Sequence, residues 1–194
     1  MKVLRSVTGS VAILDRADVD TDQIIPKQFL KRIERSGYGE FLFFDWMKDP
    51  AFELHEYPGA SILIAGRNFG CGSSREHAAW ALEDYGFRVV IAPSFGDIFR
   101  TNALKTGLAP IELPAPEIAQ LRAAVEGQND LTVDLEQLTI THPGGLRLAF
   151  PFDPYAQVTL VQGLDDIART LLLDAAISRF ESEHDARFDT RSLA

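Results

Sequence analysis

Cysteine is nearly absent from this sequence of 194 residues, which contains only Cys71. A single cysteine excludes an internal disulfide and fits a reducing compartment, so we expect a cytoplasmic protein. It also excludes an iron–sulfur cluster held by this chain alone, because such clusters take several cysteine ligands. We therefore expect no metal site and no cofactor bound by this chain.

Long apolar runs and a surplus of positive charge are also lacking. No stretch approaches the roughly 20 apolar residues that span a bilayer. The N-terminal segment MKVLRSVTGSVAILDRADVD has no long apolar core, so we do not expect it to be a signal peptide. The net charge of −9 argues against a general nucleic-acid surface. We expect neither a membrane nor a nucleic-acid partner, although a local arginine can still bind a small anionic substrate.

Two short apolar runs, residues 61–66 and 88–93, predict buried strands. Residues 75–86 lie between them and predict an amphipathic helix that ends at Gly86. A strand, a helix and a strand within about thirty residues form a βαβ unit with parallel strands. The pattern continues with a helix over 95–105, a strand over 108–113 and a helix between Pro116 and Gly127.

The periodicity changes after this parallel core. Residues 131–140 alternate between apolar and polar, and the HPGG segment that follows predicts the turn of an antiparallel hairpin. A short strand is expected over 11–14 and helix over 164–180. The predicted fold is one compact α/β domain over 1–194, a parallel βαβ core with antiparallel additions, and a frayed tail from about 183 to 194.

The segment GRNFGCGSSREHAAWAL, residues 66–82, concentrates polar groups where a strand passes into a helix. Ser73 and Glu76 match a capping box, which by itself predicts an ordinary capped helix. A glycine-rich loop before a helix is also typical of an anion site. Arg75 in the first helical turn opposes the helix dipole, which favours a functional role in binding a carboxylate or phosphate.

Cys71 and His77 are the reactive groups of this segment. A thiol nucleophile with His77 as its base is one interpretation. A lone cysteine in a glycine turn is more often a small packed residue, and a histidine on a helix is more often packed or hydrogen-bonded. We favour the packed interpretation for both.

Three aspartates alternate in the segment ADVDTDQIIPKQFLK, residues 17–31: Asp18, Asp20 and Asp22. A calcium loop of the EF-hand type fails here, because Gln23 and Phe29 occupy the positions that require glycine and glutamate. The remaining interpretation is an acidic turn capped by Thr21. A second segment, GYGEFLFFDW over 37–46, is strongly aromatic and predicts core packing or, if exposed, a lid or an apolar substrate pocket.

Taken together, residues 15–31, 66–82, 92–108 and 160–171 resemble the family of bacterial 3-isopropylmalate dehydratase small subunits. That family is similar to the C-terminal swivelling domain of aconitase. The segments GSSREHA and DTDQIIP are the most specific. The resemblance runs in order through nearly the whole chain and is weakest over 114–150 and after 180.

The resemblance implies a role for each matching residue. In the aconitase family, the serine that matches Ser73 removes a proton α to a carboxylate, and the acid that matches Asp22 lies at the same site. Ser73 and Asp22 are therefore the expected catalytic residues. The expected substrate contacts are Ser74, Arg75, Thr21 and Lys31.

The implied reaction is a dehydration and rehydration that moves a hydroxyl between adjacent carbons of isopropylmalate in leucine biosynthesis. In this family a [4Fe–4S] cluster, whose open iron acts as a Lewis acid, resides in a separate large subunit. The resemblance thus implies a large-subunit partner, a small hydroxy-diacid substrate and a chain that is inactive alone.

Relatives that bind a third carboxylate use an arginine between the first two motifs. In this sequence an aromatic loop stands in the comparable region, with Phe41, Leu42, Phe43 and Phe44 expected to set substrate specificity by meeting an isopropyl group. Lys31, Arg32 and Arg35 lie close by in the sequence and keep other substrates open. The alternatives are a sibling hydro-lyase acting on citraconate/methylmalate or homoaconitate, a non-catalytic anion-binding module, and a standalone thiol enzyme.

Overall fold

The computed structural model describes residues 1–31 and 34–183. Its chain divides into two units, Met1–Gly163 and Leu164–Ala194, whereas the sequence predicted a single domain over 1–194. Among the described residues, no helix combines the length and apolar character that a membrane crossing requires.

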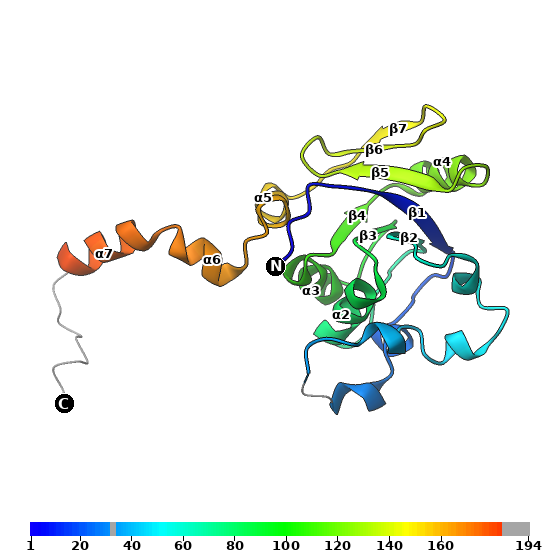
Figure 1. Ribbon diagram of the computed structural model, residues 1–194, viewed down its shortest axis with the longest axis horizontal. Coiled ribbons are helices and arrows are strands. Elements are labelled where there is room, and N and C mark those ends of the chain that lie inside the picture. Colours follow the sequence, from blue (N-terminus) through cyan, green and yellow to red (C-terminus); the bar gives the residue numbers. More distant parts are fainter. Residues whose placement is uncertain (32–33, 184–194) are drawn as a thin grey trace. The chain divides into compact units, whose positions relative to one another are not determined.

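The first unit is built on one seven-stranded sheet with the order β4-β3-β2-β1-β5-β6-β7 (Figure 1). The strands are β1 (Ser6–Leu14), β2 (Ile62–Ala65), β3 (Val89–Ala92), β4 (Ala109–Glu112), β5 (Asp130–Asp134), β6 (Thr139–Thr141) and β7 (Arg147–Ala149). Strands β1 to β4 pair in parallel. Antiparallel pairs join β1 to β5, β5 to β6 and β6 to β7. The predicted parallel core with antiparallel additions is therefore confirmed.

Strand β1 belongs to both halves of the sheet. Residues 6–10 pair antiparallel with β5, and residues 11–14 pair parallel with β2. Gly9 lies just before this change of partner, where a Cβ atom would stand 2.2 Å from the Ser61 hydroxyl oxygen. Only glycine fits such an approach without displacing its neighbour. The sequence predicted only the apolar half of this strand, over 11–14.

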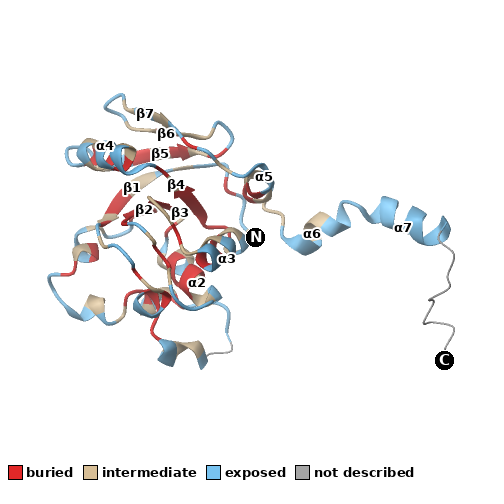
Figure 2. Cartoon of the chain, turned by 180° about the vertical axis from the view of Figure 1, so that it is seen from behind, coloured by how far each residue is buried: buried red, intermediate tan, exposed pale blue. Residues whose placement is uncertain are grey.

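Both faces of the parallel strands are buried, as parallel sheets require, and Figure 2 shows much of the central sheet in red. On one face Leu63 and Val90 pack with helices α2 (Glu76–Tyr85) and α3 (Asp97–Thr106). On the other face Ile62 and Ile64 pack with helix α4 (Ala115–Val125) and with Leu160 of helix α5 (Pro154–Gln162). The alternation of side chains along each strand thus creates two cores.

The chain between β1 and β2 forms short helices that cover the first of these cores. They are α1 (Thr21–Ile24) and the 3-10 helices η1 (Lys27–Lys31), η2 (Gly39–Phe41), η3 (Trp46–Lys48) and η4 (Glu53–Glu56). Tyr38, Leu42 and Phe43 from this segment are almost fully buried. The aromatic segment over 37–46 is therefore largely core.

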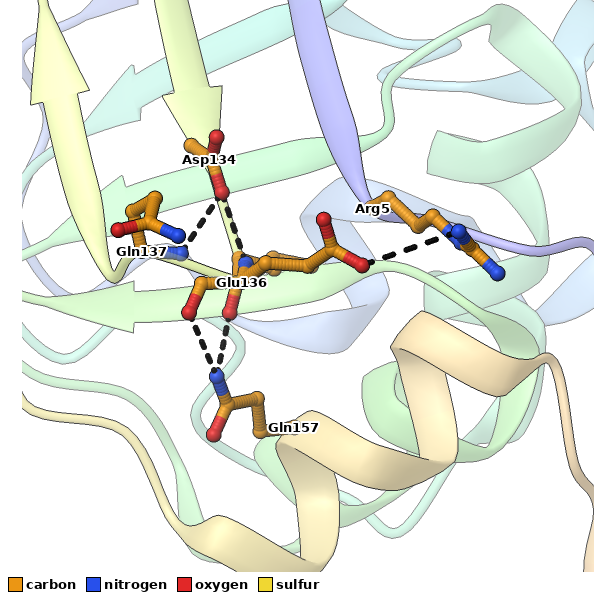
Figure 3. Close-up of polar contacts among 6 residues, drawn as sticks. Arg5, Asp134, Glu136, Gln137 and Gln157 are labelled. Carbon is orange, nitrogen blue, oxygen red and sulfur yellow. Dashed lines mark hydrogen bonds and ion pairs between the residues drawn. The ribbon is translucent and has the colours of Figure 1, made fainter.

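Hydrogen bonds order the turn after β5, as the close-up in Figure 3 shows. The Asp134 carboxylate accepts from the backbone N–H groups of Glu136 and Gln137, both at 2.8 Å. Gln157 of α5 donates its side-chain amide to the carbonyls of Leu135 at 2.6 Å and Glu136 at 3.4 Å. Helix α5 is thereby fixed to the antiparallel end of the sheet.

The second unit contains helices α6 (Asp166–Leu171) and α7 (Asp174–Glu183). Neither helix has a buried residue, and both are mainly pale blue in Figure 2. The helix predicted over 164–180 is therefore present with a break between α6 and α7. Its apolar stripe has no core to pack on within this unit, and the single domain expected over 1–194 stays a prediction. The tail predicted from about 183 falls almost wholly on residues 184–194, which lie outside the described residues.

The contrast in burial predicts the outcome of two leucine truncations. Leu63 is fully buried, whereas Leu171 is 65% exposed. We expect Leu63→Ala to lower the free energy of unfolding by about 2–5 kcal/mol because it leaves a cavity. Leu171→Ala should change it by less than about 0.5 kcal/mol.

Urea denaturation followed by tryptophan fluorescence measures this difference, since Trp46 and Trp80 both belong to the first unit. Equal losses for the two variants would contradict the assignment of the core.

Candidate functional site

Three loops follow the carboxyl ends of the parallel strands β1, β2 and β3. Beyond the strands, Asp20 still pairs with Cys71 and Phe69 pairs with Phe95 as isolated parallel bridges. The loops therefore continue the order of the sheet for several residues. In open α/β sheets, ligands bind outside the carboxyl ends of the strands, so a ligand site is expected at this edge.

The middle loop, residues 66–73, is held on both sides by main-chain hydrogen bonds. Residues 18–21 bond it on one side and residues 94–96 on the other. The bonds run from Gly70 N–H to the Val19 carbonyl (2.7 Å), from Thr21 N–H to the Cys71 carbonyl (2.9 Å), from Phe69 N–H to the Ser94 carbonyl (3.0 Å) and from Gly96 N–H to the Phe69 carbonyl (2.9 Å). Residues 69–71 of this irregular loop are thus bonded to a neighbouring segment on each side, as a strand inside a sheet is.

Glycines allow these loops to touch backbone to backbone. A Cβ atom on Gly96 would lie 2.6 Å from the Gly70 carbonyl oxygen and 3.1 Å from the Cys71 Cα atom. A Cβ atom on Gly70 would lie 2.2 Å from the ring of Phe99, and Gly70 also has a φ of +74°. A larger residue at either position would push the loops apart.

Helix α2 begins at Glu76 rather than at the predicted capping serine. Arg75 is the N-cap residue in an extended conformation, and no side chain caps the helix. The expected capping box between Ser73 and Glu76 is therefore wrong. The physical reason lies upstream, because Gly72 has a φ of +89° and the Ser73 carbonyl accepts a hydrogen bond from the Thr21 hydroxyl.

An ion pair joins the loop after β1 to the loop after β2. The Arg75 guanidinium contacts the Asp22 carboxylate, and the side chains are 17% and 49% exposed respectively. Ser73 and Ser74, next to Arg75, are exposed. The fold thus brings Asp22 to Arg75, 53 positions along the chain. A guanidinium has five N–H donors, so Arg75 can bind a further anionic group beside Asp22.

Thr21 does not cap the helix that follows it. The residue is only 1% exposed, so its burial does not support the expected contact with a substrate, which stays a prediction. The capping residue of α1 is Asp20, which forms a capping box with Gln23. The signal that could have found this cap is the D-x-x-Q spacing. Thr21 instead donates its hydroxyl to the Ser73 carbonyl at 3.1 Å.

The aromatic loop is tied to this site through α1, because Phe43 N–H donates to the Ile24 carbonyl at 2.8 Å. Phe41 stacks on Phe29 with ring centroids 4.1 Å apart, and Phe44 packs on Phe29 at 4.8 Å. Phe41 and Phe44 are half-buried, whereas Leu42 is 1% exposed and Phe43 fully buried. Phe41 and Phe44 are therefore the two that retain exposed surface, and the expectation that the four residues meet a substrate stays a prediction. Sequence spacing gave no signal for Phe29.

Lys31 is exposed at the end of η1. Among the described residues, no hydrogen bond or ion pair joins it to Asp22, Ser73 or Arg75. Its expected contact with a substrate therefore stays a prediction from the resemblance.

The pKa values of Cys71 and His77 both depart from the usual values of a thiol and an imidazole. Burial raises the pKa of the Cys71 thiol, and the negative charges of Asp20 and Asp18 add to the shift. Burial lowers the pKa of His77, whose ring packs on Trp80 with centroids 4.6 Å apart. A protonated thiol and a packed imidazole do not make a nucleophile and its base.

The donor groups of this chain do not fit an iron–sulfur cluster. Such clusters take several cysteine thiolates, and the sequence contains one cysteine. Within residues 1–31 and 34–183, no group of three or more His, Cys, Asp and Glu side chains could hold a metal ion.

Comparisons with known proteins match most of the chain. A family model of the aconitase C-terminal domain matches residues 1–116. A protein of Bacillus subtilis (strain 168), described as a 3-isopropylmalate dehydratase small subunit, is 55% identical over 192 residues, covering 94% of this chain and 96% of that protein. An Acidobacterium capsulatum protein of the same description is 52% identical over 192 residues, covering 97% and 93%.

A solved structure agrees with these relatives. A crystal structure described as 3-isopropylmalate dehydratase from Methanocaldococcus jannaschii superposes with a TM-score of 0.66. It is 25% identical in sequence, and the match covers 90% of this chain and 98% of that chain. The resemblance stated from the sequence motifs is confirmed, as is the fold that it implied.

The close contact between the loops predicts a strong effect of one added methyl group. We expect Gly96→Ala to lower the free energy of unfolding by about 1–3 kcal/mol, because the Cβ atom clashes with backbone that cannot move away. Gly127→Ala is the matched control, since its Cβ atom would meet nothing within 4 Å. It should be neutral or stabilising by up to about 1 kcal/mol. Urea denaturation of both variants tests this, and equal effects would argue against the tight loop contact.

The environment of Cys71 predicts the pH dependence of its alkylation. Iodoacetamide reacts with the thiolate, which burial and the neighbouring aspartates disfavour. The midpoint of the alkylation rate against pH should therefore be higher in the folded protein than in the same chain unfolded in urea. A midpoint at or below that of the unfolded chain would show an activated thiol instead.

Proposed function

The chain belongs to the aconitase C-terminal domain family, and from this premise we propose that it is the small subunit of a 3-isopropylmalate dehydratase. The proposed activity interconverts 2-isopropylmalate and 3-isopropylmalate by dehydration and rehydration, in leucine biosynthesis. The observation that carries the proposal is the pairing of Arg75 with Asp22 beside the exposed Ser73 and Ser74. The proposal also places the protein in the cytoplasm, in keeping with its single cysteine.

Arg75 supplies the positive charge that a hydroxy-diacid requires. A guanidinium binds a carboxylate through two parallel N–H···O bonds, which fixes the orientation of the substrate as well as its charge. The Arg75 side chain is only 17% exposed, so the interaction is screened less than on an open surface. Asp22 holds the guanidinium in place, and Ser74 offers a hydroxyl to the same carboxylate.

Ser73 is the proposed base. A serine hydroxyl is a weak base near neutral pH, and its alkoxide needs nearby positive charge and backbone donors. The neighbouring Arg75 and the first N–H groups of the ten-residue helix α2 supply both. In the proposed dehydration, Ser73 Oγ takes a proton from the carbon α to a carboxylate. In the rehydration it returns the proton to the adjacent carbon.

Departure of the hydroxyl requires an electrophile, and the residues that the structure describes include no group of side chains that could hold a metal ion for this purpose. The single cysteine cannot hold a [4Fe–4S] cluster, so the proposal assigns the cluster to the large subunit. In this proposal, the described residues of this chain bind the substrate and transfer the proton. The active site is then completed only where the two chains meet, and the isolated chain is inactive.

Phe41 and Phe44 are proposed to select the substrate. Both stay half-buried and pack on Phe29, forming an aromatic cluster linked to the segment that carries Asp22. Such a cluster favours an apolar isopropyl group over an additional carboxylate. Lys31, a proposed further contact, lies two positions from Phe29.

Reconstitution with the large subunit of the same organism tests the proposed function. The complex should interconvert the two isopropylmalates, measured by chromatography of the products, and neither chain should do so alone. Turnover of citraconate or homoaconitate but not of isopropylmalate would show that the proposed substrate is wrong and that the proposed reaction class, a hydro-lyase, is right. Assembly without turnover of any hydroxy-diacid would favour a non-catalytic anion-binding module.

Removing the proposed base should abolish most of the activity. We expect Ser73→Ala to lower kcat of the complex by about 10²–10⁴-fold, the usual contribution of a general base. Cys71→Ala is the control in the same loop and should retain kcat within about twofold, since a packed thiol takes no part in the chemistry. The reverse pattern would identify a thiol enzyme.

Arg75 and Arg67 allow a matched test of carboxylate binding. Both lie in the loop region after β2 and pair with an aspartate, Arg67 with Asp18 at 3.0 Å. Arg75→Lys keeps the charge but loses bidentate hydrogen bonding, so KM should rise by about 10–100-fold. Arg67→Lys should change KM by less than about twofold, because that pair is exposed. Similar kinetics for the two variants would remove Arg75 from the binding site.

A further inference from the structure

Thr21 is a buried polar residue that bonds to the loop of the proposed base at two points. Its backbone N–H donates to the Cys71 carbonyl at 2.9 Å, and its hydroxyl donates to the Ser73 carbonyl at 3.1 Å. Between these two acceptors lies Gly72, where a Cβ atom would stand 3.8 Å from the Thr21 hydroxyl oxygen. Three consecutive residues of the loop therefore lie against Thr21.

The main-chain bonds to residues 18–21 and 94–96 reach this loop at Phe69, Gly70 and Cys71. The residues that follow, 72–74, are all exposed, and Gly72 has a φ of +89°. Glycine visits many backbone conformations at small cost. A serine that follows a glycine on an exposed loop needs an anchor if its hydroxyl is to occupy one position.

The planarity of the peptide bond extends the effect of the anchor. The Ser73 carbonyl and the Ser74 N–H belong to one rigid trans unit and point in opposite directions. Since Thr21 holds the carbonyl on the buried side, the Ser74 N–H must point away from Thr21. The same bond fixes the Cα atom of Ser73 and hence the direction from which its hydroxyl projects.

We infer that Thr21 is a positioning residue, which acts through the peptide between Ser73 and Ser74 to hold the base and the Ser74 N–H in their reactive orientation. The inference rests on the proposed function, because it presupposes that Ser73 accepts the proton. Thr21 itself touches no substrate, since its side chain is 1% exposed.

Kinetics of the two-subunit complex with three variants test the inference. Thr21→Val removes the hydroxyl at nearly constant volume, and Thr21→Ser restores it. Thr106→Val is the matched control, because it removes a similar hydroxyl-to-carbonyl bond, from Thr106 to Ala103 at 2.8 Å. Thr106 is the last residue of α3, whereas the loop of the proposed site contacts the residues before its first turn. Thr21→Val should lower kcat by about 10–100-fold with KM changed by less than about threefold, since small misplacements of a reacting group cost this much. The other two should retain kcat within about threefold.

The primary deuterium isotope effect on kcat separates positioning from a mere loss of folded protein. With isopropylmalate deuterated at the carbon that loses its proton, the isotope effect should be larger for Thr21→Val than for the unmodified complex, because proton abstraction becomes the slower step. A smaller active fraction lowers kcat without changing the isotope effect, and this result would overturn the inference. So would full activity of Thr21→Val, or equal impairment of Thr21→Val and Thr21→Ser.

Two further outcomes keep the test decisive. If Thr21→Val does not assemble with the large subunit, Thr21→Ala takes its place in the same comparison with serine. If Thr21→Ser assembles with the large subunit but Thr21→Val and Thr21→Ala do not, the hydroxyl is required for folding. This result overturns a positioning role. An inactive unmodified complex contradicts the proposed function, whereas an active complex with an unaffected Thr21→Val contradicts this inference alone.

Discussion

The loop after β2 leaves the sheet while other chain segments still flank it, and the polar groups of its backbone need partners there. Residues 18–21 supply them on one side and residues 94–96 on the other. The approach is possible because Gly70 and Gly96 have no side chain where the segments touch. The parallel register of β1, β2 and β3 therefore decides where each residue of the loop lies, and with it the place of the whole site.

The same register concentrates charge in a chain whose overall balance is acidic. The net charge is −9, yet a partly buried guanidinium at the start of α2 lies beside two exposed serines. Interactions at contact distance outweigh those with distant exposed carboxylates, which water and salt screen. Asp22 neutralises part of this charge and leaves guanidinium donors for an incoming anion. Binding of the proposed diacid substrate thus depends on local geometry rather than on net charge.

The sequence predicted what local patterns determine. Apolar runs of ordinary strand length predicted β2, β3 and β4, and helical periodicity predicted α2 and α3, because burial on a sheet requires those patterns. The roles proposed for Ser73 and Arg75 came from motifs and stay predictions. The sequence did not predict the features that depend on contacts between distant segments. These are the double pairing of β1, the start of α2 at Glu76, and the burial of Thr21. In each case a tertiary hydrogen bond or pairing prevailed over the local signal, as at Ser73, where a capping motif yields to a bond from residue 21.

The bonds that fix the three loops run mainly between backbone atoms, and such bonds do not depend on which side chain a residue carries. The frame can therefore persist while side chains around it are exchanged during evolution or design. Phe41 and Phe44 are half-buried and lie outside that set of bonds, so they are replaceable without rebuilding it. If these aromatic side chains select the substrate as proposed, one scaffold acquires new substrates by exchanging a few of them, with the proposed base left in place.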